Sequence, residues 1–340
     1  MIDPHSSRRS ELHDFVAAHF PRGDFTLAPA SADASFRSYW RVDGGGETRV
    51  VMDAPPDKED IAPWLDIGAR LREAGLHTPQ VFAVDQARGF ILMEDLGNRT
   101  YLPELNAASA DALYGDALDA LLTMQTRVPP ADLPMFDEAL LRSGMENLPI
   151  WLFDRHLGFV PDAEDRATIE AAFALLVANA RAQPQVFVHR DFHSRNLMIA
   201  TRDNPGIIDF QGALYGPIAY DLASLLRDCY IAWPRERVDA WVRDYHQRLR
   251  AAGVIDADAA TFRRWFDLIG LQRHTRLLGQ FCRLNYRDGK PGYLDDLPLT
   301  LRYVLDVARG YPELATFADL IERAVGERDI THPRAQEQPA

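Results

Sequence analysis

The sequence predicts an α+β protein with two lobes, a small antiparallel-sheet N-terminal lobe (residues 1–94) and a larger, mostly helical C-terminal lobe (residues 95–326). Short apolar runs separated by turn residues fill the first hundred positions, a pattern typical of hairpins. Beyond them the chain changes to long stretches with helical spacing of apolar residues. A length of 340 residues is enough to bury a core in each lobe. The last residues, 327–340, are rich in Pro, Gln and charge and predict a flexible tail.

The N-terminal lobe is expected to consist of a helix, a hairpin, a second helix and a second hairpin. The glycine-rich turn at 43–46 favours the first hairpin, and Gly75 is a suitable C-cap for the second helix. In chain order the expected elements are a helix at 11–20, strands at 39–42 and 48–52, a helix at 61–74, and strands at 80–84 and 89–93.

The C-terminal lobe is expected to be helical except for short strands at 186–188, 197–200 and 206–208. No internal repeat divides it. The amphipathic stretches lie at 109–126, 137–157, 163–181, 219–230, 235–252, 258–285, 296–309 and 312–325.

Composition excludes several classes of protein. A formal net charge of -13 argues against nucleic acid as a partner, because phosphate binding needs a basic surface. Cys229 and Cys282 show no metal-type spacing, so a reducing cytoplasm is expected. The N-terminus has no signal-peptide pattern, and no apolar run reaches the length of a bilayer span, so no membrane partner is expected. We expect a cytoplasmic monomer or weak dimer that acts on a small molecule.

The segment from 186 to 210 contains the residues that indicate chemistry. An apolar strand leads into His189 and Asp191, and Asn196 precedes the next strand; Asp209 follows Ile207 and Ile208. An aspartate can orient an acceptor hydroxyl, while an asparagine and a second aspartate can hold Mg²⁺ against nucleotide phosphates. The spacing HxDxxxxN followed by apolar-apolar-Asp-Phe is far more specific than HxD alone. The competing interpretation makes both aspartates turn residues or helix caps.

These motifs resemble the aminoglycoside phosphotransferase and choline kinase branch of the protein-kinase-like fold. The run GPIAYDLA at 216–223 is similar to the second signature of that branch, and the resemblance covers about residues 25–310. It implies that ATP and Mg²⁺ are the cofactors, that Asp191 is the catalytic base, and that Asn196 and Asp209 are metal ligands. It also implies that His189 and Asp221 brace the catalytic loop.

The resemblance also locates the expected nucleotide contacts. The segment 32–39 lies where a nucleotide loop is expected, and 91–97 is similar to an adenine-binding hinge. The expected cofactor-binding residues are Ser35, Phe36, Arg37, Arg49, Glu94 and Leu96. The strand at 49–54 lacks the lysine that usually pairs with nucleotide phosphates, and Arg41, Arg49 and Lys58 remain candidates for its charge.

A stripe of basic residues marks the expected substrate side of the C-terminal lobe. Helical spacing places Arg273, Arg276, Gln280, Arg283 and Arg287 on one face. Guanidinium groups suit carboxylates and hydroxyl-rich ligands, so the four arginines are expected to bind substrate. A solvated, salt-bridged helix face explains the same pattern, and both interpretations stay open.

The segments 52–56, 93–97 and 287–290 closely resemble bacterial anomeric kinases of cell-wall amino sugars. This resemblance implies direct in-line phosphorylation of the C1 hydroxyl of N-acetylmuramate or N-acetylglucosamine during peptidoglycan recycling. The lactyl carboxylate of N-acetylmuramate would suit an arginine-bearing pocket. The alternatives are a kinase of another small alcohol, such as an aminoglycoside, choline or homoserine, and a nucleotide-binding pseudokinase, which the missing lysine suggests.

Overall fold

The computed structural model describes residues 4–20, 24–31 and 36–334. The chain forms two compact units, each assembled from separate stretches of sequence. Unit 1 comprises Met1–Val128 and Arg195–Gly212, and unit 2 comprises Pro129–Ser194 and Ala213–Ala340. The expected lobe boundaries after residues 94 and 326 stay predictions.

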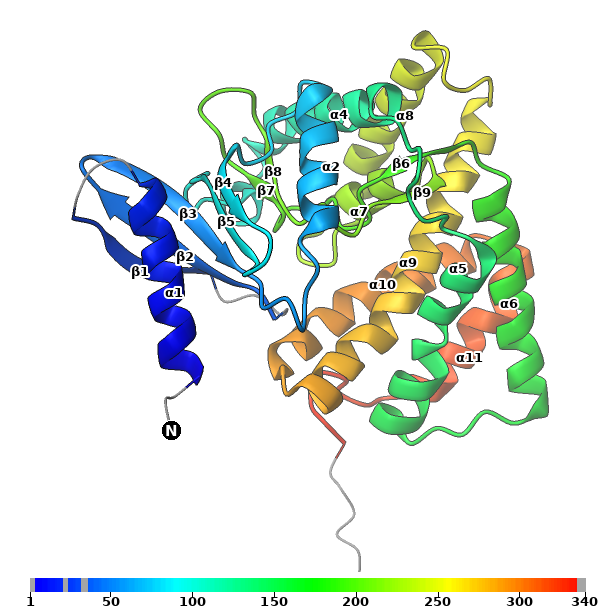
Figure 1. The fold of residues 1–340 in the computed structure, drawn as a ribbon. Helices are drawn as coiled ribbons and strands as arrows, with labels where there is room; N and C mark the ends of the chain where they lie inside the picture. Colours follow the sequence, from blue (N-terminus) through cyan, green and yellow to red (C-terminus); the bar gives the residue numbers. More distant parts are fainter. Residues whose placement is uncertain (1–3, 21–23, 32–35, 335–340) are drawn as a thin grey trace, which may run out of the picture. The chain divides into compact units, whose positions relative to one another are not determined.

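Unit 1 contains an antiparallel sheet in the order β1-β2-β3-β5-β4 (Figure 1). Its strands are β1 (Thr26–Ser31), β2 (Ser38–Gly44), β3 (Glu47–Asp53), β4 (Val81–Asp85) and β5 (Phe90–Glu94). The structure therefore contains both expected hairpins, with ends shifted by one or two residues. Sequence analysis missed β1, an edge strand whose Pro29 and small residues give no apolar alternation.

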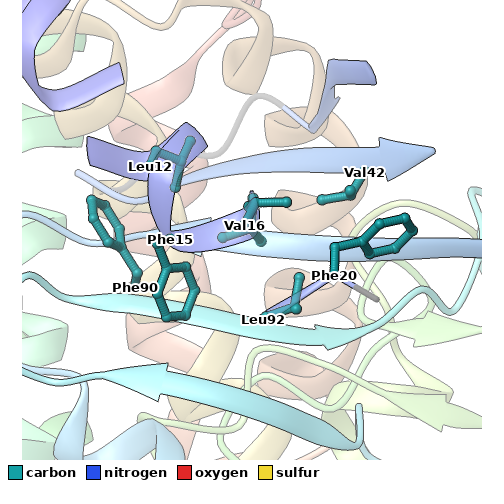
Figure 2. Close-up of a cluster of buried hydrophobic side chains, with 8 residues drawn as sticks. Leu12, Phe15, Val16, Phe20, Val42, Phe90 and Leu92 are labelled. Carbon is teal, nitrogen blue, oxygen red and sulfur yellow. The ribbon is translucent and has the colours of Figure 1, made fainter. Parts of the chain in front are cut away.

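Helix α1 (Pro4–His19) covers one face of this sheet, and Figure 2 shows the apolar cluster between them. The cluster consists of Leu12, Phe15, Val16, Phe20, Val42, Val51, Phe90 and Leu92, all at most 5% exposed. Arg8 of the same helix donates to Asp53 at the end of β3, with Nε 2.8 Å from Oδ1. Apolar burial and one ion pair thus hold the helix on the sheet.

The rest of unit 1 brings the segment 195–212 against the sheet-bearing part of the chain. It contains α2 (Ala62–Glu73), α3 (Tyr101–Glu104), α4 (Ala110–Arg127), and the paired short strands β7 (Leu197–Met198) and β8 (Gly206–Ile207). Trp64 of α2 packs on Phe210, with ring centroids 5.2 Å apart. Gly68 permits this approach, because a Cβ there would lie 3.0 Å from Phe210 Cζ. Asn196 and Asp209 are therefore residues of unit 1.

Unit 2 is mostly helical and is organised around one long helix, α9 (Ala259–Asp288). The other helices are α5 (Glu138–Met145), a π-helix (Leu148–Leu157), α6 (Ala163–Arg181), α7 (Tyr220–Leu226), α8 (Arg235–Ala251), α10 (Leu297–Arg309) and α11 (Ala315–Val325), with 3-10 turns at Pro291–Asp296 and Pro312–Leu314. Strand β6 (Gln185–Val188) pairs with β9 (Leu214–Pro217), which sequence analysis missed.

The single helix expected over 137–157 is wrong, because the chain changes from α to π geometry around Glu146 and Asn147. Helix α9 passes very close to this junction. A Cβ at Gly279 would lie 2.1 Å from the carbonyl of Asn147, so only glycine fits there. The amphipathic pattern over 137–157 indicates which face of the helix is buried, but it does not indicate the change from α to π geometry.

We predict that Phe15→Ala lowers the free energy of unfolding by about 3–4 kcal/mol, because it empties the centre of the cluster under α1. Urea denaturation followed by circular dichroism measures the change. Val84→Ala, at a side chain that is 40% exposed in the same unit, is the control and should cost about 0.5 kcal/mol or less. A loss below about 1 kcal/mol for Phe15→Ala would show that α1 does not depend on this cluster.

Candidate active site

The expected site residues fall in both units. In unit 2, strand β6 ends at Val188 and delivers His189 to Asp191 into a loop. The buried carboxylate of Asp221, in the first turn of α7, accepts from the backbone N–H groups of His189 and Arg190 at 2.6 and 2.9 Å. These two bonds fix the backbone immediately before Asp191. Burial raises the pKa of Asp221 to about 7, although both N–H bonds favour its charged form.

A second carboxylate holds the far end of the same loop. Asp228 accepts from the backbone N–H of Ser194 at 3.0 Å and from its hydroxyl at 2.5 Å, with both groups buried. The sequence pattern did not predict this role for Asp228. The amphipathic stretch at 219–230 suggests one helix, but α7 ends at Leu226 and Asp228 follows it in irregular backbone.

Asp191 lies in a strongly cationic environment. Removal from water disfavours its carboxylate, yet the pKa of Asp191 is below its ordinary value. The groups that hold the pKa down are Arg276, His193, Arg273 and Arg190. Asp191 is therefore ionised at neutral pH, as an acceptor for a hydroxyl proton must be.

The loop also contains strained backbone. Arg190 has φ 79° and, in unit 1, Asp209 has φ 63°. Left-handed conformations cost a residue with a Cβ about 1–2 kcal/mol and persist where the surroundings enforce them. Both residues belong to the motifs that predict chemistry, which is where such strain concentrates.

In unit 1, Asn196 and Asp209 lie side by side and line the same cavity, whose volume is about 400 Å³. Asn196 Nδ2 donates to Asp209 Oδ2 at 3.3 Å, and Gln211 Nε2 donates to Asp209 Oδ1 at 2.6 Å. Amide and carboxylate oxygens are the ligands that Mg²⁺ prefers when phosphates complete its coordination. No group of three or more His, Cys, Asp or Glu side chains suited to a metal occurs in the described residues. This pair therefore fits a magnesium ion that is shared with a nucleotide.

The same cavity has apolar walls and includes the expected hinge. Glu94 and Leu96 both line it, as do the apolar side chains of Val50, Trp64, Met93, Met198, Ile208 and Phe210. A cavity of about 400 Å³ lined by both apolar and polar side chains is of the size that holds a nucleotide base. Of the expected nucleotide loop, Ser35 lies outside the described residues, and Phe36 is 67% exposed.

Arg37, an expected nucleotide contact, and the three basic candidates for the missing lysine take different positions in unit 1. Arg37, with a side chain only 10% exposed, brings Nη2 to 3.7 Å from Asp209 Oδ1. Arg41 lines the cavity but forms a two-point pair with Asp95, at 2.6 and 2.9 Å.

Arg37, Arg49 and Lys58 are not among the residues lining the cavity. Arg49 pairs with Glu47 and lies over the Phe82 ring at 4.0 Å, and Lys58 is exposed beside Asp57. Of these four basic residues, Arg37 is the one whose charge lies beside Asp209.

The structure separates the four arginines of the expected stripe. Arg276 and Arg283 line a cavity of about 190 Å³ in unit 2, with Gln280 between them in sequence. Arg273 is fully buried, and Arg287 is exposed and paired with Asp288 at 2.8 Å. A fifth arginine, Arg190, also lines this cavity and is not among the arginines that the sequence pattern predicts as substrate contacts.

The sequence pattern of the "Phosphotransferase enzyme family" matches residues 26–262. An N-acetylmuramate/N-acetylglucosamine kinase of Pseudomonas putida is 46% identical over 311 residues, covering 91% of each chain. The kinase of the same name from Neisseria meningitidis is 39% identical and covers 95% of this chain and 98% of that one.

Among solved structures, a choline kinase of Streptococcus pneumoniae has a TM-score of 0.62 at 12% identity, covering 88% of this chain and all of that one. An ADP-bound aminoglycoside phosphotransferase has a TM-score of 0.59 at 17% identity, covering 88% and 98%. The predicted α+β, protein-kinase-like fold is confirmed by these likenesses. Within the residues that the structure describes, no helix has the length and hydropathy needed to cross a bilayer.

Proposed function

This chain belongs to the phosphotransferase enzyme family, and we propose that it transfers the γ-phosphoryl group of ATP to the C1 hydroxyl of N-acetylmuramate or N-acetylglucosamine. The observation that carries the proposal is its 46% identity, over nine tenths of both chains, to a kinase named for these two sugars. We extend the proposal to a cytoplasmic role in peptidoglycan recycling, as a monomer or weak dimer.

We propose that Asp191 orients the acceptor hydroxyl and accepts its proton. The carboxylate is ionised, and its loop is held at both ends by Asp221 and Asp228. In a loose phosphoryl-transfer transition state the proton leaves late, so a weak base in a fixed position is sufficient. His189 contributes its backbone N–H to this bracing, and Asp221 contributes the carboxylate.

We propose that Asn196 and Asp209 hold Mg²⁺, which when bound neutralises charge on the nucleotide phosphates. The 400 Å³ cavity of unit 1 holds the adenine and ribose, with backbone groups around Glu94 and Leu96 beside the base. Arg37 supplies the positive charge that other kinases take from a strand lysine. Residues 1–94 are thus the main part of the nucleotide-binding lobe, and 95–326 form the catalytic and acceptor-binding lobe.

Incubation of the protein with ATP, Mg²⁺ and a panel of sugars and amino alcohols, followed by mass spectrometry, tests the function. The expected product is an amino-sugar 1-phosphate. Phosphorylated choline, homoserine or aminoglycoside in its place would identify a different kinase. Nucleotide binding without any product would identify a pseudokinase.

We predict that Asp191→Asn lowers kcat by about 10²–10⁴-fold, because the amide cannot accept the hydroxyl proton. The Kd for ATP should stay within about twofold, since Asp191 is not among the residues that line the nucleotide cavity. Steady-state kinetics and calorimetry measure the two quantities, with Asp319→Asn on the exposed face of α11 as the control. Near-normal turnover would remove Asp191 from the role of base.

We predict that Asp209→Ala abolishes the magnesium-dependent part of nucleotide binding, because it deletes the cavity carboxylate that lies within hydrogen-bond distance of Asn196. Titration calorimetry with ATP in the presence and absence of Mg²⁺ measures that part directly. Asp57→Ala, at a side chain 73% exposed, should bind like the wild type. Undiminished magnesium dependence in Asp209→Ala would assign the metal to other residues.

We predict that Arg37→Gln weakens ATP binding in the presence of Mg²⁺ by about tenfold or more, the usual effect of losing one charge-assisted hydrogen bond. Arg70→Gln, which removes the same type of group from an ion pair on α2, is the matched control. Equal affinities for the two variants would exclude Arg37 as the substitute for the missing lysine.

A further inference from the structure

The 190 Å³ cavity of unit 2 carries more positive charge than its own residues balance. Its polar side chains are Ser143, Asn147, Arg190, Arg276, Gln280 and Arg283, and no carboxylate lines it. In the described part of the chain, no carboxylate oxygen lies within 4 Å of a guanidinium nitrogen of Arg190, Arg276 or Arg283. We call these three residues and their cavity the guanidinium pocket.

The hydrogen bonds of the guanidinium pocket also leave room for an anion. Arg276 Nη1 donates to the hydroxyl of Tyr220, and Arg283 Nη2 donates to Gln280 Oε1, both at 3.0 Å and both to neutral acceptors. The Nε atoms of Arg190 and Arg283 are buried and have no acceptor among the described residues. Buried donors without acceptors are costly, and planar guanidinium groups match the two oxygens of a carboxylate.

Positive charge around Arg283 supports the same conclusion. Removal from water and the neighbouring Arg287 and Arg276 lower the pKa of Arg283, while Asp288 acts in the opposite sense. Gly144 of α5 leaves space for Arg276, because a Cβ there would lie 3.0 Å from Arg276 Cδ. The carboxylate of Asp191 interacts electrostatically with Arg276 and Arg190, but Asp191 does not line the pocket itself.

The volume of the guanidinium pocket limits which ligand groups can enter it. A volume of about 190 Å³ corresponds to about six waters and is below the range of pockets that enclose a whole ligand. It suits a small charged substituent of a larger acceptor. It does not suit the ammonium groups of choline or an aminoglycoside, which the three arginines would repel.

We propose that the guanidinium pocket binds a carboxylate carried by the acceptor sugar, so that the chain selects the acidic amino sugar N-acetylmuramate over neutral ones. This inference rests on the proposed function, and it assigns that sugar's lactyl carboxylate to Arg190, Arg276 and Arg283. Arg273 and Arg287 of the expected stripe are not part of the guanidinium pocket.

The test compares kcat/KM for N-acetylmuramate with that for its carboxamide, which has nearly the same shape and no charge. N-acetylglucosamine is the third acceptor. We expect the wild type to prefer the acid at least tenfold, and Arg283→Gln to lower the acid-to-amide ratio by about 10–100-fold. Arg264→Gln removes a guanidinium from the same helix, where it pairs with Glu313, and should keep the wild-type ratio.

The outcomes separate the two proposals. Equal use of acid and amide by the wild type, or an unchanged ratio in Arg283→Gln, overturns the carboxylate assignment while leaving a sugar kinase. If the wild-type protein phosphorylates none of the three acceptors, the proposed function is overturned. The assignment of an acceptor carboxylate to the guanidinium pocket is then overturned as well.

Discussion

The buried carboxylate of Asp221 is the group on which the arrangement of the acceptor side depends. It accepts two backbone N–H bonds from the loop that follows β6, and so it fixes the direction in which that loop leaves the strand. Arg190 adopts a left-handed backbone under this constraint. The side chain of Arg190 then lines the guanidinium pocket, and Asp191 follows it directly. A neutral side chain at 221 could accept only part of this hydrogen bonding, so the strain at Arg190 would no longer be held in place.

In unit 1, β3 carries no lysine, the residue that usually pairs with nucleotide phosphates in this fold. The sheet presents Val50 toward the nucleotide cavity, and Met52 is buried. Charge comes instead from side chains before and within β2. Arg37 lies beside Asp209, and Arg41 ties β2 to Asp95 of the hinge through two hydrogen bonds and to the carbonyl of Gly97 through a third. Arg37, just before β2, thus places a cation beside Asp209, and Arg41 of β2 fastens this strand to the segment after β5.

The sequence was sufficient to predict the fold class, most element positions and the candidate residues of the phosphoryl-transfer site, because strong periodicity and a specific motif are local properties. It was not sufficient for β1, which shows no apolar alternation, for β9, which pairs with the distant β6, or for the π-helix, whose start lies against Gly279 of α9. The arginine stripe shows most clearly how far helical spacing can predict the surroundings of a side chain. Helical spacing indicates that these side chains share a face, but only packing decides that Arg273 is buried, Arg276 and Arg283 line a cavity, and Arg287 meets solvent.

Arg190 and Arg276 belong to the guanidinium pocket and also hold down the pKa of Asp191, together with His193 and Arg273. Anion binding and the proton affinity of the base are therefore thermodynamically linked. An acceptor carboxylate in the guanidinium pocket offsets part of the positive field that stabilises ionised Asp191. The basicity of Asp191 therefore rises in the complex of enzyme and acceptor. A neutral acceptor leaves that field intact and meets a weaker base. The charge of the acceptor would in this way act as an activator of its own phosphorylation, in addition to strengthening its binding.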